Sequence, residues 1–332
     1  MKKNILKLSI FLIIILSLTL ASIVNGLQIK TNSTNTLKST YQENEKSNDD
    51  GWYYLPSYQN YAPKGLPDFD QRGQKDWKSR FIIWSFCAPT SVSNIFWWFD
   101  SKHSDPNGYP GDGVDSYPLV RDLQSPGDAI PGPLSDDHNY NNVNSEITPA
   151  PKEKDSGELI DQVAWYVNQN NRQRKLRLNL WGGTQQKDLK SGVEQWIENA
   201  GLSDDYKVEE IKRPSFSYIS EKLSENAGIV LLLRFIKPGV FPKLFPCFCG
   251  HYVSLAGVNQ RDEYVAISDP YLNVMNPDPS PTDHNDASVV SHDIYKVEST
   301  PVGQWSASWQ LPGYWFSGAF VTYALIITEV NY

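Results

Sequence analysis

Cysteine is scarce in this sequence, with three among 332 residues. Three cysteines can close at most one bridge, so a disulfide framework is excluded and stability must come from packing. Positive charge is also scarce, since 30 Lys and Arg against 38 Asp and Glu give a net charge of -8 with no visible basic patch. We therefore expect no nucleic-acid partner, because phosphate binding needs a basic surface.

Long apolar runs are missing except at the start of the chain. Lys2, Lys3 and Lys7 precede a nearly unbroken apolar run over 8–20, and the small residues Ala21, Ser22 and Gly26 follow it. This layout is typical of a secretory signal peptide, cleaved after Ala21 or Gly26. A retained anchor is the alternative, although the run is short for a full membrane span. The sequence thus predicts a secreted or cell-surface-associated protein.

Three segments follow from the changes in composition along the chain. Residues 1–26 are the predicted signal peptide, and 27–50 form a polar linker with too few large apolar side chains to fold, which could hold the protein at a surface. Residues 51–332 form one domain, rich in Trp and Tyr, with an acidic insertion of Pro, Gly and Asn at about 101–156. A loop this long is expected to be a lid or a wall of a substrate cleft.

The domain contains the patterns of both helices and strands. Apolar residues with helical spacing predict helices over 157–168, 187–200 and 215–226. The continuous apolar run 228–233 predicts a strand buried on both faces, and the run 318–328 predicts a final strand of the same sheet. The fold class is therefore expected to be α+β.

Cys87 stands at the start of the most apolar predicted helix. Pro89 suits the first turn, and the aromatic residues over 96–99 indicate a helix that is buried in the centre of the domain. The free N–H groups and the dipole at a helix N-terminus favour a thiolate, which is the reactive form of cysteine. A buried cysteine more often serves as a small apolar side chain, so Cys87 alone proves nothing.

A predicted hairpin supplies the partners of a nucleophilic thiol. One strand opens at His251, the next closes at Asp269, and the short connection 259–262 joins them. In a hairpin the first residue of one strand lies beside the last residue of the other, so His251 and Asp269 are expected at the same end of the sheet. Cys87, His251 and Asp269 then fit the roles of nucleophile, general base and orienting carboxylate.

Gln71 is the candidate for the oxyanion hole. It ends a short segment, predicted to be extended, that precedes Cys87. Its amide N–H₂ could bind a developing oxyanion together with the backbone N–H of Cys87. An exposed loop amide is the alternative, and Gln74 is a rival for the same role.

Four segments together resemble papain-like cysteine peptidases of the double-glycine leader peptidase type and their secreted relatives. These segments are 67–71, 87–89, 250–253 and 267–270. The resemblance implies a central helix that carries the cysteine, packed on an antiparallel sheet that carries the histidine and the aspartate. It implies the roles given above for Cys87, His251, Asp269 and Gln71, a peptide or protein substrate, and no cofactor. The chain departs from the family in having Ala88 where a glycine is usual, and in a longer spacing between Gln71 and Cys87.

The predicted function is thus a secreted cysteine peptidase that forms a thioester acyl-enzyme. One alternative is a non-catalytic cell-surface binding or adhesion module on the same fold. Another is an amidase or an acyl transferase with the same triad, because the choice of acceptor depends on the shape of the cleft.

Metal sites remain minor alternatives. The segments 105–108 and 112–115 carry oxygen ligands for calcium but lack the terminal glutamate of a complete loop motif. Cys247 and Cys249 are too close together for a typical zinc pair, so packing or redox chemistry is the expected role. Three acidic histidine clusters could form a metal site if their loops converged, and otherwise are solvated loops or local caps. They are Asp136-Asp137-His138, His284-Asn285-Asp286 and His292-Asp293.

Overall fold

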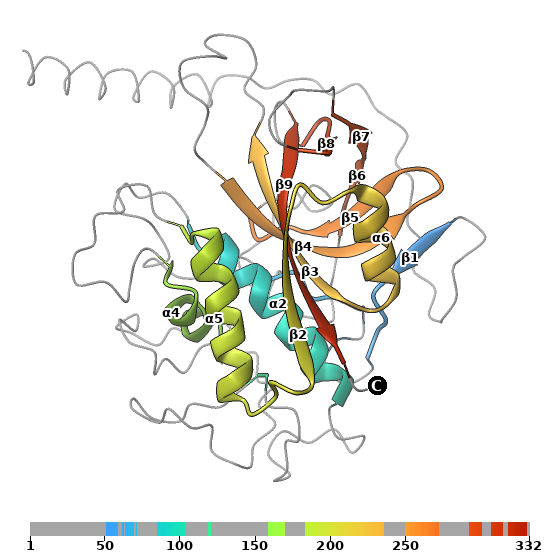
Figure 1. The fold of residues 1–332 in the computed structure, drawn as a ribbon. Helices are drawn as coiled ribbons and strands as arrows, with labels where there is room; N and C mark the ends of the chain where they lie inside the picture. Colours follow the sequence, from blue (N-terminus) through green and yellow to red (C-terminus); the bar gives the residue numbers. More distant parts are fainter. Residues whose placement is uncertain are drawn as a thin grey trace, which may run out of the picture. The chain divides into compact units, whose positions relative to one another are not determined.

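The structure is a computed structural model. It describes residues 51–58, 62, 64–69, 71, 85–103, 119–120, 159–169, 183–235, 250–271, 292–300, 307–314 and 318–330. These residues belong to one compact unit, 45–332. They form a mixed α+β fold in which helices pack on a large antiparallel sheet (Figure 1).

The described helices are α2 (Cys87–His103), α4 (Leu159–Tyr166), α5 (Gln186–Asn199) and α6 (Phe216–Ser224). The described strands are β1 (Trp52–Tyr54), β2 (Tyr206–Lys212), β3 (Gly228–Phe235), β4 (Gly250–Asn259), β5 (Tyr264–Ser268), β6 (Asp293–Lys296), β7 (Glu298–Ser299), β8 (Trp309–Leu311) and β9 (Ala319–Glu329).

Helix α2 is the central helix, and every residue from Cys87 to Ser101 is buried. Three of its four hydroxyl groups donate to carbonyl oxygens four residues earlier in the chain, whereas the hydroxyl of Ser91 has no partner among the described residues. Thr90 donates to Phe86 and Ser93 donates to Pro89. Burying a hydroxyl is costly unless it is hydrogen-bonded, so these bonds let a helix with polar residues lie in the core.

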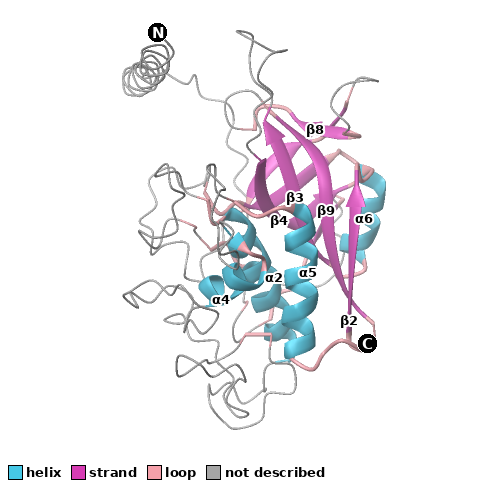
Figure 2. Ribbon diagram, turned by 60° about the vertical axis from the view of Figure 1, so that its left-hand side comes forward, coloured by secondary structure: helices cyan, strands magenta, loops and turns pink. Residues whose placement is uncertain are grey.

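The sheet runs in the order β6-β5-β4-β3-β9-β8-β7, with β1 added beside β4 and β2 beside β9. All these pairs are antiparallel. Figure 2 shows α2, α4 and α5 on one side of the sheet and α6 on the other. Strands β3 and β4 are therefore covered on both faces, by α2 and by α6, which explains their nearly continuous burial.

Gly228 allows α2 to lie close to the sheet. A Cβ atom at this position would lie 2.3 Å from Cγ2 of Ile95 and 2.9 Å from the ring of Phe99. Any larger residue would push the helix away from β3. The glycine at the start of this strand thus helps to set the distance between the helix that carries Cys87 and the sheet.

Most of the predicted elements are confirmed. The three predicted helices correspond to α4, α5 and α6, and Ser215 caps α6 by accepting the backbone N–H of Tyr218. The predicted strands over 228–233 and 318–328 are β3 and β9 of one sheet, and β4 and β5 form the predicted hairpin. Strands β1, β2, β6, β7 and β8 were not predicted, because they are short or lack a clear alternation of apolar residues.

Several predictions concern residues outside the described ranges. These are the signal peptide 1–26, the linker 27–50, nearly all of the insertion at about 101–156, and the pair Cys247 and Cys249. Among the helices that the structure describes, none is long and apolar enough to cross a membrane.

Candidate active site

Cys87 is the first residue of α2, as the sequence predicts. Its side chain is 7% exposed, and it is a free thiol. The first backbone N–H groups of a helix have no partner within the helix and point outward from its N-terminus. Cys87 therefore combines a thiol with the N-terminal end of a helix dipole, at the edge of the core.

His251 is the second residue of β4, where it lies opposite Leu233 of β3. Its Nε2 atom lies 2.7 Å from Oδ1 of Asp269, the residue that follows β5. An ionised carboxylate only accepts hydrogen bonds, so Nε2 carries a proton and donates it. The hairpin thus brings the histidine and the aspartate together at one end of the sheet.

The electrostatics around His251 favour the charged imidazolium. Burial alone lowers the pKa of His251, but the charge of Asp269, its hydrogen bond, and a hydrogen bond with Cys87 outweigh burial and raise the pKa to about 10. Because Asp269 occupies Nε2, the ring nitrogen that remains for Cys87 is Nδ1. The imidazole therefore links the thiol to the carboxylate.

Asp269 is held by two further groups. The backbone N–H of Tyr271 donates to Oδ1 at 2.9 Å, and the hydroxyl of Tyr314 donates to Oδ2. Asp269 is only 1% exposed, so these donors replace the water that an ionised carboxylate would otherwise need. Tyr314 was not predicted from the sequence, since a lone tyrosine in the connection between β8 and β9 carries no recognisable signal.

Gln71 lies beside the same end of the hairpin. Its backbone N–H donates to the carbonyl oxygen of Pro270 at 2.8 Å, one residue after Asp269. The side chain is buried at 3% exposure, and its Oε1 atom has no hydrogen-bond partner among the described residues. The alternative of an exposed loop amide is therefore wrong. Gln74, its rival, lies outside the described residues.

The segment before Gln71 does not join the sheet as a strand. Residues 67–69 have no ladder partner and are held by side chains of α2 and β5 instead. Oδ1 of Asn94 accepts the backbone N–H of Phe69 at 3.1 Å, and the hydroxyl of Ser268 donates to the carbonyl of Pro67 at 2.8 Å. These bonds fix the segment between the helix of Cys87 and the strand before Asp269.

A second polar link joins α2 directly to β4. The hydroxyl of Ser254 donates to the carbonyl of Ser91 at 2.9 Å, and Nδ2 of Asn94 donates to the same hydroxyl at 3.4 Å. All three residues are fully buried. Because Asn94 contacts both β4 and the segment that leads to Gln71, it ties together the parts that carry Cys87, His251 and Gln71.

The acidic histidine clusters do not form a metal site in the described part of the chain. His292 and Asp293 are buried, so their interpretation as solvated loop residues is wrong. Nε2 of His292 lies 3.0 Å from the carbonyl oxygen of Leu66 and donates to it. No group of three His, Cys, Asp or Glu side chains suited to a metal occurs among the described residues. The clusters at 136–138 and 284–286 lie outside them.

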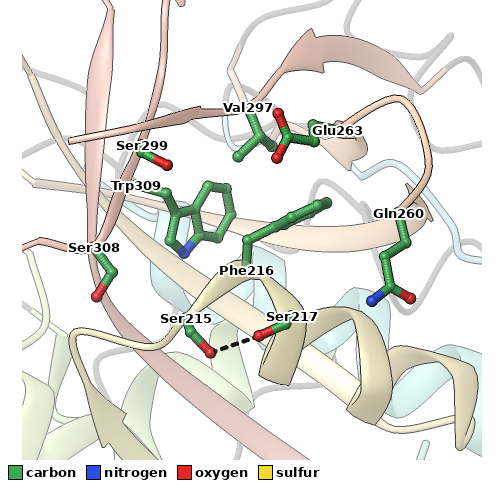
Figure 3. Close-up of a pocket in the computed structure, with 9 residues that line it drawn as sticks. All are labelled: Ser215, Phe216, Ser217, Gln260, Glu263, Val297, Ser299, Ser308 and Trp309. Atoms are coloured by element: carbon green, nitrogen blue, oxygen red, sulfur yellow. Dashed lines mark hydrogen bonds between the residues drawn. The ribbon is translucent and has the colours of Figure 1, made fainter.

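A separate pocket of about 360 Å³ lies between the start of α6, the β4–β5 turn and strands β7 and β8 (Figure 3). Phe216 and Trp309 line it together with several serines, and none of the four predicted site residues does. Trp309 is only 2% exposed, and its indole N–H donates to the carbonyl of Pro214. Trp309 therefore presents little surface to the pocket, whereas Phe216 is only partly buried.

No family model matches the sequence, and no curated protein matches it. The chemistry of the site must therefore be inferred from its geometry.

Proposed function

We propose that this protein is a cysteine peptidase with a papain-like fold, in which Cys87, His251 and Asp269 form the catalytic triad. The observation that carries the proposal is the 2.7 Å hydrogen bond between Nε2 of His251 and Oδ1 of Asp269, in a histidine that also bonds Cys87. A thiol at a helix N-terminus, a base in contact with it, and a carboxylate that orients the base are the parts that nucleophilic catalysis needs.

The papain-like fold is supported by the arrangement of these elements. The buried helix α2 carries Cys87 at its tip and packs on β3 and β4 of an antiparallel sheet. His251 and Asp269 come from the β4–β5 hairpin of that same sheet. This is the arrangement that the family resemblance implies.

In the proposed reaction the Cys87 thiol proton is already on Nδ1 of His251 in the resting enzyme, which forms a thiolate–imidazolium pair. The thiolate attacks the carbonyl carbon of a peptide bond, and the oxyanion receives hydrogen bonds from the Cys87 backbone N–H and the Gln71 side-chain amide. The C–N bond then breaks as the imidazolium gives its proton to the leaving amine. Water, deprotonated by His251, attacks the thioester, releases the acid and restores the thiolate–imidazolium pair.

Gln71 suits the oxyanion role because its backbone is fixed beside Asp269 and its side chain is buried at the same end of the hairpin. An oxyanion only accepts hydrogen bonds, so the side-chain N–H₂ of Gln71, and not Oε1, would bind it.

We further propose that the enzyme acts outside the cell. The basic start, apolar run and small-residue exit of residues 1–26 support export, and the polar segment 27–50 would separate the domain from a membrane or wall. The mass of the exported protein tests this proposal. Removal of 21 or 26 residues is expected, whereas a full-length exported chain would contradict cleavage.

The decisive experiment measures the rate of Cys87 alkylation by iodoacetamide against pH. Cys247 and Cys249 are replaced by serine so that Cys87 is the thiol that iodoacetamide labels. Labelling should remain fast at pH values where an ordinary thiol is protonated, and His251→Ala should abolish this fast labelling. His103→Ala is the matched control, because His103 lies at the opposite end of the same helix and contacts Glu329.

A positive result leads to a peptide-library digestion with Cys87→Ala as the inactive control. Cleavage of peptide bonds, with a thioester on Cys87 detected by mass spectrometry, is the expected outcome. Ordinary thiol behaviour in both the parent and His251→Ala would contradict the proposal and favour a binding module. Fast labelling without peptide cleavage would point instead to amidase or transferase chemistry.

A further inference from the structure

Tyr314 lies behind the proposed triad, on the side of Asp269 away from His251. Oδ1 of Asp269 accepts from Nε2 of His251 and from the backbone N–H of Tyr271, while Oδ2 accepts from the hydroxyl of Tyr314. The two carboxylate oxygens thus have different donors. Rotation of the carboxylate would break all three hydrogen bonds at once.

We propose that Tyr314 is a positioning residue, which holds Asp269 in the ionised form and in the orientation that bonds His251. This inference rests on the proposed function. Tyr314 touches neither the thiol nor a substrate in this scheme, and it acts only through Asp269. Hydrogen bonds donated to a carboxylate stabilise its charged form, and a charge-assisted bond is stronger than a neutral one.

The aromatic ring of Tyr314 is fixed by its neighbours, so its hydroxyl cannot swing away. The side chain is fully buried, and its ring centroid lies 5.0 Å from that of Tyr295 and 6.1 Å from that of Phe235. Phe235 also stacks near His251, with centroids 6.4 Å apart. The same aromatic cluster therefore packs both the donor to Asp269 and the histidine that Asp269 orients.

Tyr314 remains a donor at every pH at which the enzyme could work. Burial and the nearby Asp269 carboxylate raise the pKa of Tyr314 well above its usual value. The other titratable groups around it are Tyr295 and Asp293 of β6, and both act in the same direction. On the side of α2, Cys87 interacts with His251, which in turn bonds Asp269. The proton on Tyr314 is thus always available to Asp269.

Tyr295 offers a matched control within the same cluster. Its ring packs against Tyr314, but its hydroxyl has no hydrogen-bond partner among the described residues. Tyr314→Phe and Tyr295→Phe each remove one buried hydroxyl and keep the ring. Only the first removes a hydrogen bond to Asp269, so a general effect of packing or stability should appear in both variants.

The test measures the pH dependence of Cys87 alkylation in the full chain with Cys247 and Cys249 replaced by serine. Tyr314→Phe should shift the acid limb of the alkylation curve upward by about one pH unit, with about tenfold slower labelling near pH 5. Without the charge-assisted bond from Tyr314, Asp269 takes up a proton at a higher pH and then no longer stabilises the imidazolium of His251. Tyr295→Phe should follow the parent curve. Thermal unfolding of each variant verifies that the fold is retained.

A double-mutant cycle decides whether Tyr314 acts through Asp269. In an Asp269→Asn background the carboxylate charge is gone, so adding Tyr314→Phe should produce no further shift. A shift of the same size in that background would overturn the proposal. Superimposable curves for Tyr314→Phe and Tyr295→Phe would overturn it as well.

The two proposals fail in different ways in this experiment. If His251→Ala labels like the parent, no thiol–imidazole pair exists, and the proposed function fails together with the role of Tyr314. If His251→Ala loses fast labelling while Tyr314→Phe does not, the triad stands and only the positioning role is wrong.

Discussion

The backbone N–H of Gln71 lies 2.8 Å from the carbonyl oxygen of Pro270, the residue after Asp269. This bond joins two segments that are about 200 residues apart in the sequence. It places the candidate oxyanion donor at the end of the hairpin that carries His251 and Asp269. The relationship makes the role of Gln71 open to direct testing.

Gln71→Ala should lower kcat by roughly 100-fold to 1000-fold, which is the usual effect of removing one oxyanion donor, while KM changes little. Steady-state hydrolysis of a peptide found in the library screen measures both constants. Gln74→Ala is the matched comparison and should retain the parent rate. The reverse pattern, with Gln74→Ala impaired and Gln71→Ala active, would move the oxyanion role to Gln74.

In Asp269→Asn the free energy of unfolding should depend less on pH, between about 6.5 and 10, than it does in the parent. The pKa of His251 is raised to about 10 in the folded protein, against about 6.5 in an unfolded chain. Above pH 6.5 the unfolded state loses its proton while the folded state keeps it. The stabilisation by the ion pair is therefore full below pH 6.5 and is lost as the pH rises towards 10.

Urea unfolding of the parent and of Asp269→Asn at pH 6, 8 and 10 measures this loss. The parent should have the larger free energy of unfolding at pH 6, and the difference from Asp269→Asn should decrease at pH 8 and again at pH 10. Asp262→Asn is the control, because Asp262 is exposed in the β4–β5 turn and its partner Arg261 is exposed as well. A constant difference between parent and Asp269→Asn would show that His251 is not charged in the folded state.

His292→Gln should make the protein less sensitive to acid. Burial lowers the pKa of His292 to about 4, although the hydrogen bond to Leu66 acts in the opposite direction. Between pH 6.5 and 4 the unfolded state binds a proton that the folded state does not, so the parent loses stability as the pH falls. The loss from this one group is at most about 3 kcal/mol.

Glutamine keeps an N–H donor that can reach the carbonyl of Leu66, so His292→Gln is expected to fold. Thermal unfolding of the two proteins is measured from pH 7 to pH 4.5. The unfolding temperature of the variant should rise relative to that of the parent at each lower pH. A gap that does not change with pH would mean that His292 titrates at its ordinary pKa, in disagreement with its burial.

Asn94→Leu should destabilise the domain and impair the site together. Leucine has a similar size but leaves the backbone N–H of Phe69 buried without an acceptor, which costs about 1 to 3 kcal/mol. The urea midpoint should fall, and the rate of Cys87 alkylation should fall as well, because Asn94 also bonds Ser254 of β4, the strand that carries His251. Ser191→Ala, at an exposed site on α5, should change neither quantity. Unchanged alkylation in Asn94→Leu would show that other contacts hold β4 beside α2.

The local elements of this protein could be predicted from the sequence alone. The start of α2 at Cys87 follows from Pro89 and the apolar spacing after it, and the β4–β5 hairpin follows from two apolar runs joined by a short polar turn. These signals lie within a few residues of each other and depend on local geometry and burial. The proximity of His251 and Asp269 follows in turn from the pairing of neighbouring strands.

Contacts between distant segments were decided only by the tertiary structure. Tyr314 meets Asp269 across 45 residues, and Asn94 meets Ser254 across 160. Strand β2 pairs with β9 although its sequence, Tyr206–Lys212, is largely charged, because the pairing depends on the partner strand and not on its own pattern. The burial of His292 was missed for the same reason. Whether a polar residue finds a buried partner depends on what the rest of the chain places beside it, and no local pattern records that.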